Sequence, residues 1–362
     1  MENIKNGCKF QWSILKKWIS NLHFQPQIAH PKERDIMPTW GEILKELREV
    51  MEREKKSPFD MVRRKYLKKL SDYTGRNTIL YATKWTQPGE IPSEMISITD
   101  EDIQGFMEVI SGLSGDNLDL IIHSPGGSAE ATEALVKYLR SKFTHIRAII
   151  PYGAMSAATM LACAADEIIM GKHSFIGPID PQVIVYTRLG RRAIPAQAII
   201  DQFKIAKREC KDDPKNLGVW LPIIEQYGPA LIVECENAIE LSKSLVLEWL
   251  TQYMFKKDDN GKEIAKKVAE TLANHSLFKS HGRHIDREQA KEIGLKIMNL
   301  EDDNELQDLV LSVFHATTHT FDGTRAVKII ENHVGKAFIK QLQLHQIIVP
   351  AQSPKPPKSL NG

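Results

Sequence analysis

Residues 121–128 read Ile-Ile-His-Ser-Pro-Gly-Gly-Ser, and residues 153–158 read Gly-Ala-Met-Ser-Ala-Ala. The first stretch predicts a buried strand that ends in a tight turn, where Gly126 and Gly127 can present bare backbone N–H groups. The second predicts a serine, Ser156, at the amino end of a helix that follows another buried strand. A hydroxyl nucleophile and backbone donors for an oxyanion are what acyl transfer needs, so the pair indicates a hydrolase.

Ser156 has a plain structural explanation as well as a catalytic one. Serine is favoured at helix amino termini, so Ser156 alone is consistent with an ordinary helix cap. The Gly-Gly turn alone is consistent with a tight connection that binds no ligand. The two motifs together favour catalysis, because the small residues around Ser156 let a substrate backbone approach. In this interpretation the N–H groups of Gly126, Gly127 and Ala157 form an oxyanion hole.

Strand and helix patterns alternate from residue 77 onward. Continuous apolar strands joined by helices are typical of a parallel sheet covered on both faces, so the sequence predicts an α/β fold. Strands are expected at residues 77–82, 118–122, 147–151 and 167–170, and helices at 99–113, 130–142 and 156–165. Beyond these, we expect a hairpin between 183–187 and 192–194, and a mostly helical region over 195–300.

The chain divides into three parts by pattern. Residues 1–74 are expected to form an N-terminal extension that is partly helical, with a helix beginning at Ser57-Pro58. Residues 75–345 carry the strand and helix alternation and form the main domain. Residues 346–362 are rich in Pro, Lys and Ser and are expected to be disordered.

Composition excludes several functional classes. The 48 basic and 46 acidic residues nearly balance, so we expect no binding to nucleic acid. The four cysteines are far apart, which argues against disulfides and a zinc site and favours a reducing compartment. No run of 18 apolar residues occurs and the first residues do not resemble a secretory signal, so we expect no membrane span and a cytoplasmic protein.

The motifs resemble those of a known superfamily. Residues 119–181, with Ser-Pro-Gly-Gly, Ala-Met-Ser-Ala and Ile-Gly-Pro-Ile-Asp-Pro, resemble the Clp/crotonase superfamily. Within it, the resemblance is to the serine dehydrogenase proteinase family, which is related to signal peptide peptidase A. Residues 282–295 resemble the element that closes the core of such peptidases, and the likeness covers about residues 75–345.

This resemblance implies a fold, a nucleophile and partners. The implied fold is a ββα-spiral core, here with an N-terminal helical extension and a helical C-terminal region. Ser156 is the implied nucleophile, a peptide or unfolded protein is the implied substrate, and assembly into a homo-oligomer is expected. No cofactor and no metal are implied.

The general base is the open question. Clp-type peptidases carry a histidine after the third strand, but here residues 176–181 read Ile-Gly-Pro-Ile-Asp-Pro, with Asp180 or a neighbour in its place. This departure points to a Ser/Lys dyad, as in signal peptide peptidase A. A lysine base must be neutral, so it needs burial or a nearby positive charge. His173, beside Lys172, is expected to be exposed in a turn.

Two lysines are the main candidates. Lys243 shares the edge of an apolar helix face with Ile239 and Val246, and its surroundings are similar to the base region of stomatin-cleaving peptidases. It is also consistent with a lysine whose stem covers apolar surface. Lys211 occupies a position similar to the lysine of signal peptide peptidase A, although the charges around it favour a solvated role. Other lysines nearby, Lys204 and Lys207, stay open.

We therefore expect a serine peptidase that acts through an acyl-enzyme, with Ser156 as nucleophile and Lys243 or Lys211 as base. Two alternatives remain. Crotonase relatives share the fold and the oxyanion hole but act on acyl-CoA thioesters. A scaffold or binding protein that keeps the fold without a competent base is the non-catalytic alternative.

Overall fold

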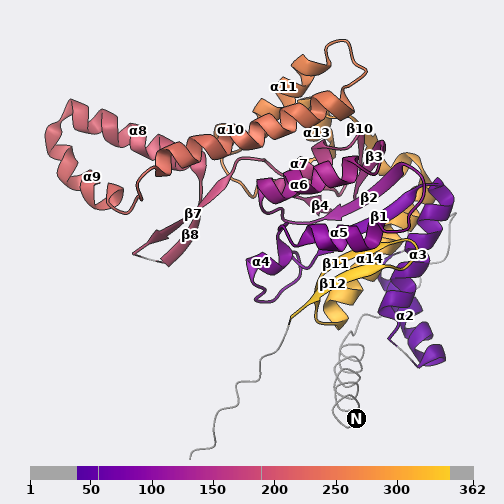
Figure 1. Cartoon of the computed structure of the whole chain (residues 1–362). Helices are drawn as coiled ribbons and strands as arrows, with labels where there is room; N and C mark the ends of the chain where they lie inside the picture. Colours follow the sequence, from indigo (N-terminus) through magenta and orange to yellow (C-terminus); the bar gives the residue numbers. More distant parts are fainter. Residues whose placement is uncertain (1–38, 56, 189, 343–362) are drawn as a thin grey trace, which may run out of the picture.

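The computed structural model describes residues 39–55, 57–188 and 190–342 (Figure 1). The tail predicted at 346–362 and the first 38 residues of the predicted extension lie outside the described residues. No helix in the described part of the chain combines the length and the apolar character that crossing a membrane requires.

The centre of the molecule is a seven-stranded sheet with the order β10-β5-β3-β2-β1-β11-β12. Its strands are β1 (Asn77–Thr83), β2 (Asn117–His123), β3 (His145–Ile150), β5 (Glu167–Met170), β10 (Ile297–Asn299), β11 (Ala326–Asn332) and β12 (Ala337–Gln341). The five strands from β10 to β1 are parallel, which confirms the predicted parallel sheet. The antiparallel pairs of β1 with β11 and of β11 with β12 extend the sheet at one edge, where no strand was predicted.

Helices cover both faces of this sheet (Figure 1). Apart from α10 (Leu231–Trp249), the described helices outside residues 182–240 are α2 (Trp40–Glu54), α3 (Phe59–Thr74), α4 (Ser93–Ile96), α5 (Asp102–Ile110), α6 (Ala129–Arg140), α7 (Ala157–Cys163), α11 (Gly261–Leu272), α12 (His275–Phe278), α13 (Arg287–Ile293) and α14 (Asn304–Gly323). Along β2, Leu120 and Ile122 join the core that contains α5, α6 and α7, whereas Ile121 joins the core under α3 and α14. The alternation of side chains along a strand explains why the strands read as continuous apolar runs.

Helix α3 belongs to the second of these cores. Its Leu67 and Leu70 are fully buried and pack with β1 and α14. The boundary predicted at residue 74 stays a prediction, as does the spiral repeat of the core.

A small second sheet lies beside the main one and has the order β4-β6-β9. It joins β4 (Gly153–Ala154), β6 (Phe175–Ile176) and β9 (Ile285–Asp286). Strand β4 pairs parallel to β6, and β6 pairs antiparallel to β9. This sheet therefore joins β4 and β6 to β9, which follows them by more than a hundred residues in the sequence.

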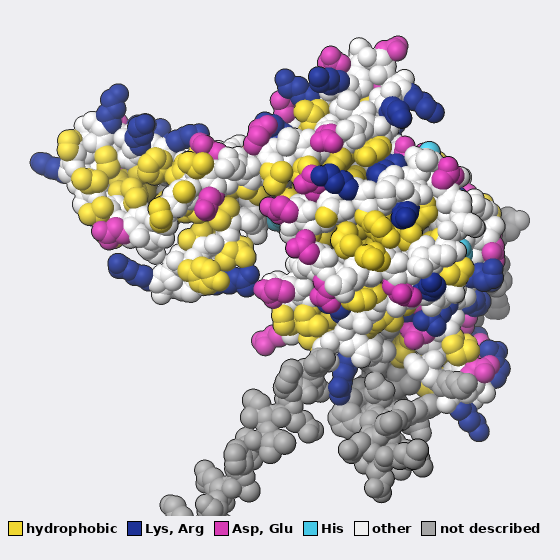
Figure 2. Space-filling view, in the orientation of Figure 1, with side chains coloured by type: hydrophobic (Ala, Val, Ile, Leu, Met, Phe, Trp, Pro, Cys, Tyr) yellow, Lys and Arg dark blue, Asp and Glu magenta, His cyan; other side chains and the backbone are white. Residues whose placement is uncertain are grey.

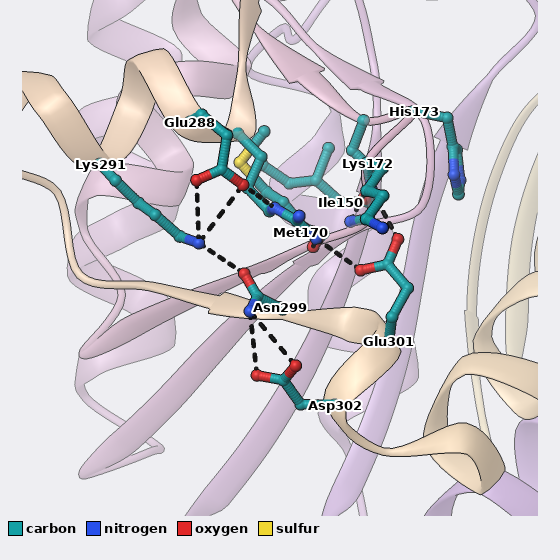
Figure 3. A network of polar contacts seen from close by, with 12 residues as sticks. Ile150, Met170, Lys172, His173, Glu288, Lys291, Asn299, Glu301 and Asp302 are labelled. Atoms are coloured by element: carbon teal, nitrogen blue, oxygen red, sulfur yellow. Dashed lines mark hydrogen bonds and ion pairs between the residues drawn. The ribbon is translucent and has the colours of Figure 1, made fainter.

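The segment after β9 is fastened to the edge of the main sheet by a polar network (Figure 3). Arg287, at the start of α13, forms an ion pair with Glu301 in which Nη1 and Oε2 lie 2.5 Å apart. Glu301 also accepts a hydrogen bond from the backbone N–H of Lys172 at 2.7 Å. Lys291 donates to Asn299 in β10 at 2.5 Å. These contacts hold α13, and with it the loop that leads into β9, in a defined position.

Residues 182–240 form an arm that projects from the core (Figure 1). The arm contains β7 (Gln182–Thr187), β8 (Gly190–Pro195), α8 (Ala196–Asp212), α9 (Leu217–Ile224) and the first half of α10 (Leu231–Trp249). Strands β7 and β8 pair antiparallel with Val183 opposite Ile194, so the predicted hairpin is confirmed. The second half of α10 returns to the core, where Val246 and Trp249 are buried, and a π-helical turn at Leu250–Met254 continues it.

Candidate active site

Ser156 lies at the junction of β4 and α7, at the amino end of a helix as predicted. Its backbone has φ 51° and ψ −121°, a conformation that non-glycine residues rarely adopt. Such strained positions occur where a surrounding fold holds a functional side chain in place. The side chain makes no capping hydrogen bond to α7, so the helix-cap explanation of this serine has no support.

The Ser-Pro-Gly-Gly turn is hydrogen-bonded directly to the serine segment. The Ser124 N–H donates to Gly153 O at 3.2 Å, and the Met155 N–H donates to Ser124 O at 3.0 Å. Gly126 has φ +97°, and a Cβ atom there would lie 2.5 Å from Met155 O and 2.7 Å from Ala157 N. Glycine is therefore required for the turn to approach Ser156 so closely. The two sequence motifs form one site.

The backbone of Gly127 faces the cleft. On one side the Ile98 N–H donates to Gly126 O at 2.8 Å, and the Ser128 N–H donates to Ile98 O at 3.0 Å. Successive backbone groups of an extended strand point to opposite edges, so the Gly127 N–H points away from Ile98. Within the described ranges, neither this N–H nor that of Ala157 donates to another group.

Gly126 differs from Gly127 in this respect, because its N–H donates to Ser124 Oγ at 3.2 Å. Two free donors beside a strained serine match the geometry of an oxyanion hole. Of the three N–H groups predicted as donors, those of Gly127 and Ala157 are thus available, whereas Gly126 lets the turn approach Ser156.

Ser156 opens into a cleft of about 740 Å³ between the core and the arm hairpin. The space-filling view shows the opening between these two parts (Figure 2). Met160, Ile179 and Leu241 line it with apolar surface near the serine, and Gln182 and Ile184 of β7 form part of the opposite wall. Clefts with mostly apolar walls and a few polar groups are typical of binding sites.

A histidine that the sequence analysis did not select also lines this cleft. His281 Nδ1 lies 2.9 Å from Oδ1 of Asp180, a carboxylate that is only 2% exposed. If the carboxylate is ionised it can only accept, so Nδ1 carries the proton and Nε2 has the free lone pair of a base. Serine, histidine and buried carboxylate are the three components of a serine-protease triad.

The fold holds Asp180 through its own loop. The Gly177 N–H donates to Thr159 Oγ1 in α7 at 3.0 Å, and the Ile179 N–H donates to Leu272 O at the end of α11 at 2.9 Å. Pairing of β6 with β9 brings the loop of His281 alongside. The histidine and the aspartate therefore come from segments that are far apart in the sequence and that these contacts place together.

The lysine candidates lie elsewhere. Lys243 forms an ion pair with Glu240 at 2.5 Å and is not among the cleft-lining residues, although its neighbour Ser242 is. Lys211 is exposed near the end of α8 in the arm. Lys204 and Lys207 are exposed earlier in the same helix. Among the described residues none of these lysines contacts Ser156, so the lysine assignment gains no support.

His173 is exposed in a turn after β5, as predicted, and lies apart from the dashed contacts in Figure 3. His281 was missed because it stands one residue before the recognised stretch 282–295. The available signal was Asp180: an acid in the place of the expected histidine can also pair with a histidine from another segment. In the described part of the chain no group of three or more His, Cys, Asp or Glu residues is arranged to hold a metal ion.

Comparison with known proteins identifies a family and two relatives of this chain. A family model described as ClpP-like SDH-type serine proteinase matches residues 53–310. The uncharacterized protein MJ0137 of Methanocaldococcus jannaschii is 31% identical over 201 residues, which are 55% of this chain and 60% of that protein. The uncharacterized protein MJ1495 of the same organism is 30% identical over 201 residues, 55% of this chain and 59% of that protein. The chain thus spans about 60% of these relatives, whose names assign no activity.

Proposed function

Because the chain belongs to the family of ClpP-like SDH-type serine proteinases, we propose that it is a serine peptidase with the triad Ser156, His281 and Asp180. The single observation that carries this assignment is the hydrogen bond between His281 and Asp180 at the cleft that Ser156 also lines. The order Ser, Asp, His along the chain is one of several in which the same triad geometry is found.

In the proposed reaction, His281 Nε2 accepts the proton of the Ser156 hydroxyl while the oxygen attacks the peptide carbonyl carbon. The oxyanion that forms accepts hydrogen bonds from the N–H groups of Gly127 and Ala157. His281 then donates its proton to the leaving amine, and an acyl-enzyme remains. Water, activated by the same histidine, hydrolyses the ester and restores Ser156. These steps require neither a cofactor nor a metal.

We propose an extended peptide or an unfolded protein as the substrate. The free edge at Gly127 allows an extended chain to add as a further strand, so that main-chain hydrogen bonds supply affinity. The apolar side chains of Met160, Ile179 and Leu241 favour an apolar substrate residue next to the scissile bond. Folded proteins have few segments that can enter in this way.

We also propose that copies of the chain assemble through the arm. The arm exposes large apolar side chains that its own small core leaves uncovered (Figure 2). They are Ile184, Tyr186, Phe203, Ile205, Leu217, Val219, Leu221 and Val233. Exposed apolar surface of this kind marks an interaction site, and a second copy of the chain is the simplest partner.

The test is cleavage of unfolded casein and of fluorogenic peptides by wild type and single variants. We expect Ser156→Ala, His281→Ala and Asp180→Asn to lose cleavage, whereas Lys243→Ala and Lys211→Ala retain it. Full activity of Ser156→Ala would exclude the proposed site. Loss of activity in one lysine variant, with His281→Ala still active, would instead establish the Ser/Lys dyad.

A further inference from the structure

The carboxylate of Asp180 is shared between two imidazoles. Its Oδ1 atom lies 2.9 Å from His281 Nδ1, and its Oδ2 atom lies 2.7 Å from His275 Nδ1. Because Asp180 is only 2% exposed, bulk water is not available to replace either histidine. Each oxygen of this buried carboxylate thus depends on one imidazole N–H for its hydrogen bond.

His275 itself does not line the cleft. It is the first residue of the short helix α12, and its side chain is 15% exposed. The Asn274 side chain caps this helix by accepting the Leu277 N–H at 3.1 Å, so the helix does not need the imidazole to form. The imidazole of His275 therefore reaches the site only through Asp180.

We propose that His275 is a positioning residue for His281. By donating a hydrogen bond from Nδ1–H to Asp180 Oδ2, it fixes the rotamer in which Asp180 Oδ1 accepts a hydrogen bond from His281. The terminal torsion of an aspartate is broad, so one hydrogen bond alone fixes the carboxylate poorly. Proton transfer requires the base to stay within hydrogen-bond reach of the nucleophile. The hydrogen bond to Asp180 orients His281, so a carboxylate that rotates would also let the imidazole move.

The inference rests on the proposed triad and predicts a particular kinetic defect. Loss of His275 leaves a buried oxygen without a donor and loosens His281, while the cleft that binds the peptide is unchanged. The defect should therefore fall on kcat and leave KM unchanged. Leaving a buried acceptor unsatisfied corresponds to a loss of roughly 10- to 100-fold in rate.

The experiment compares His275→Ala with His275→Asn in the full chain. The amide nitrogen of asparagine can take the place of Nδ1 and donate to Oδ2, so this variant should recover most of the rate. The readouts are kcat and KM for a fluorogenic peptide, the rate at which a fluorophosphonate labels Ser156, and the far-downfield proton NMR signal of the His281 Nδ1–H. His333→Ala is the matched control, because this half-buried imidazole accepts a hydrogen bond from the Thr78 N–H in β1 and is not among the residues that line the cleft.

The expected result is a loss of kcat and of labelling in His275→Ala, recovery in His275→Asn, and wild-type rates in His333→Ala. The downfield signal should weaken in His275→Ala and return in His275→Asn. Wild-type kcat in a folded His275→Ala protein would overturn the inference and leave the triad intact. An inactive wild type that no fluorophosphonate labels would overturn the triad, and the inference with it.

Discussion

The core and the arm differ in how much apolar surface they leave exposed to solvent. In the core, two apolar clusters fill both faces of the sheet, and the buried carboxylate of Asp180 is paired with His281. In the arm, a small cluster that includes Val185, Ile199 and Leu231 is buried, while Tyr186 is 76% and Val219 is 69% exposed.

The difference separates two requirements. A catalytic site needs side chains held to within fractions of an ångström, and a densely packed core provides that rigidity. A contact surface needs apolar area that stays available until the partner arrives, and an arm with a small core provides that area. We therefore expect changes in the core to act on chemistry and stability, and changes in the arm to act on assembly.

The largest effect should come from the triad. Replacing His281 by asparagine keeps an amide N–H that can donate to Asp180 but removes the base, so kcat/KM should fall by about 10⁴-fold or more. The melting temperature and the assembly state should stay at wild-type values, because His281 is outside both the apolar clusters and the arm. Parallel peptide kinetics and light scattering test this. A change in assembly would contradict the separation of the two regions.

The next largest effect should follow from breaking the buried ion pair between Lys328 and Asp102, which lies beside the segment that pairs with Gly127. Lys328 donates to Asp102 at 2.6 Å and to Ser97 O at 2.7 Å, next to the Ile98 that pairs with Gly127. Burial lowers the pKa of Lys328, and Asp102 opposes that shift. Lys328→Met should lower the free energy of unfolding by about 3–5 kcal/mol, because the carboxylate of Asp102 stays buried and loses its counter-ion.

The control for this variant removes the partner as well. The double variant Lys328→Met, Asp102→Leu should regain much of the lost stability in urea unfolding, since no uncompensated charge remains. A single variant as stable as the wild type would show that the pair does not hold this part of the core.

Acid should destabilise the core by a smaller amount. Burial lowers the pKa of His123 to about 3 and that of His319 to about 4. The unfolded chain takes up these protons near pH 6.5, so below this pH the unfolded state binds more protons and stability falls as the pH drops toward 4. At pH 5 each histidine should lower the free energy of unfolding by about 2 kcal/mol.

Urea unfolding at pH 7 and pH 5 measures this difference, and His123→Phe should reduce it. The arm contains no histidine in residues 182–240, so its contribution should not depend on pH in this range. Equal free energies of unfolding at the two pH values would show that these histidines titrate as they do in water.

The smallest effect on stability, with the largest effect on assembly, should come from the arm. Val219→Asp should change the free energy of unfolding by no more than about 0.5 kcal/mol, because the side chain is already exposed. It should nevertheless lower the assembled fraction in analytical ultracentrifugation. Lys207→Asp is the matched control, since it changes charge on the same arm without removing apolar surface. Unchanged assembly in Val219→Asp would exclude this face as the contact.

Much of the core was predictable from local pattern. The strands β1, β2, β3 and β5 fall where continuous apolar runs stand between helix signals, because a strand in a parallel sheet is buried on both faces. The hairpin of the arm was predicted from the turn that the sequence indicates at residues 189–190. Strands β11 and β12 were missed, since Lys328 and Glu331 are charged and nothing local indicates that they are buried with partners.

The sequence by itself determined the segment of Ser156 and the glycine turn, because the positive φ of Gly126 and the small residues around Ser156 are requirements of the local backbone. Only the tertiary structure decided which histidine lines the same cleft as Ser156. Asp180 and His281 are joined by a hydrogen bond across 101 residues, and the pairing of β6 with β9 sets that distance. A side chain becomes a general base through its neighbours in space, and local sequence does not contain those neighbours.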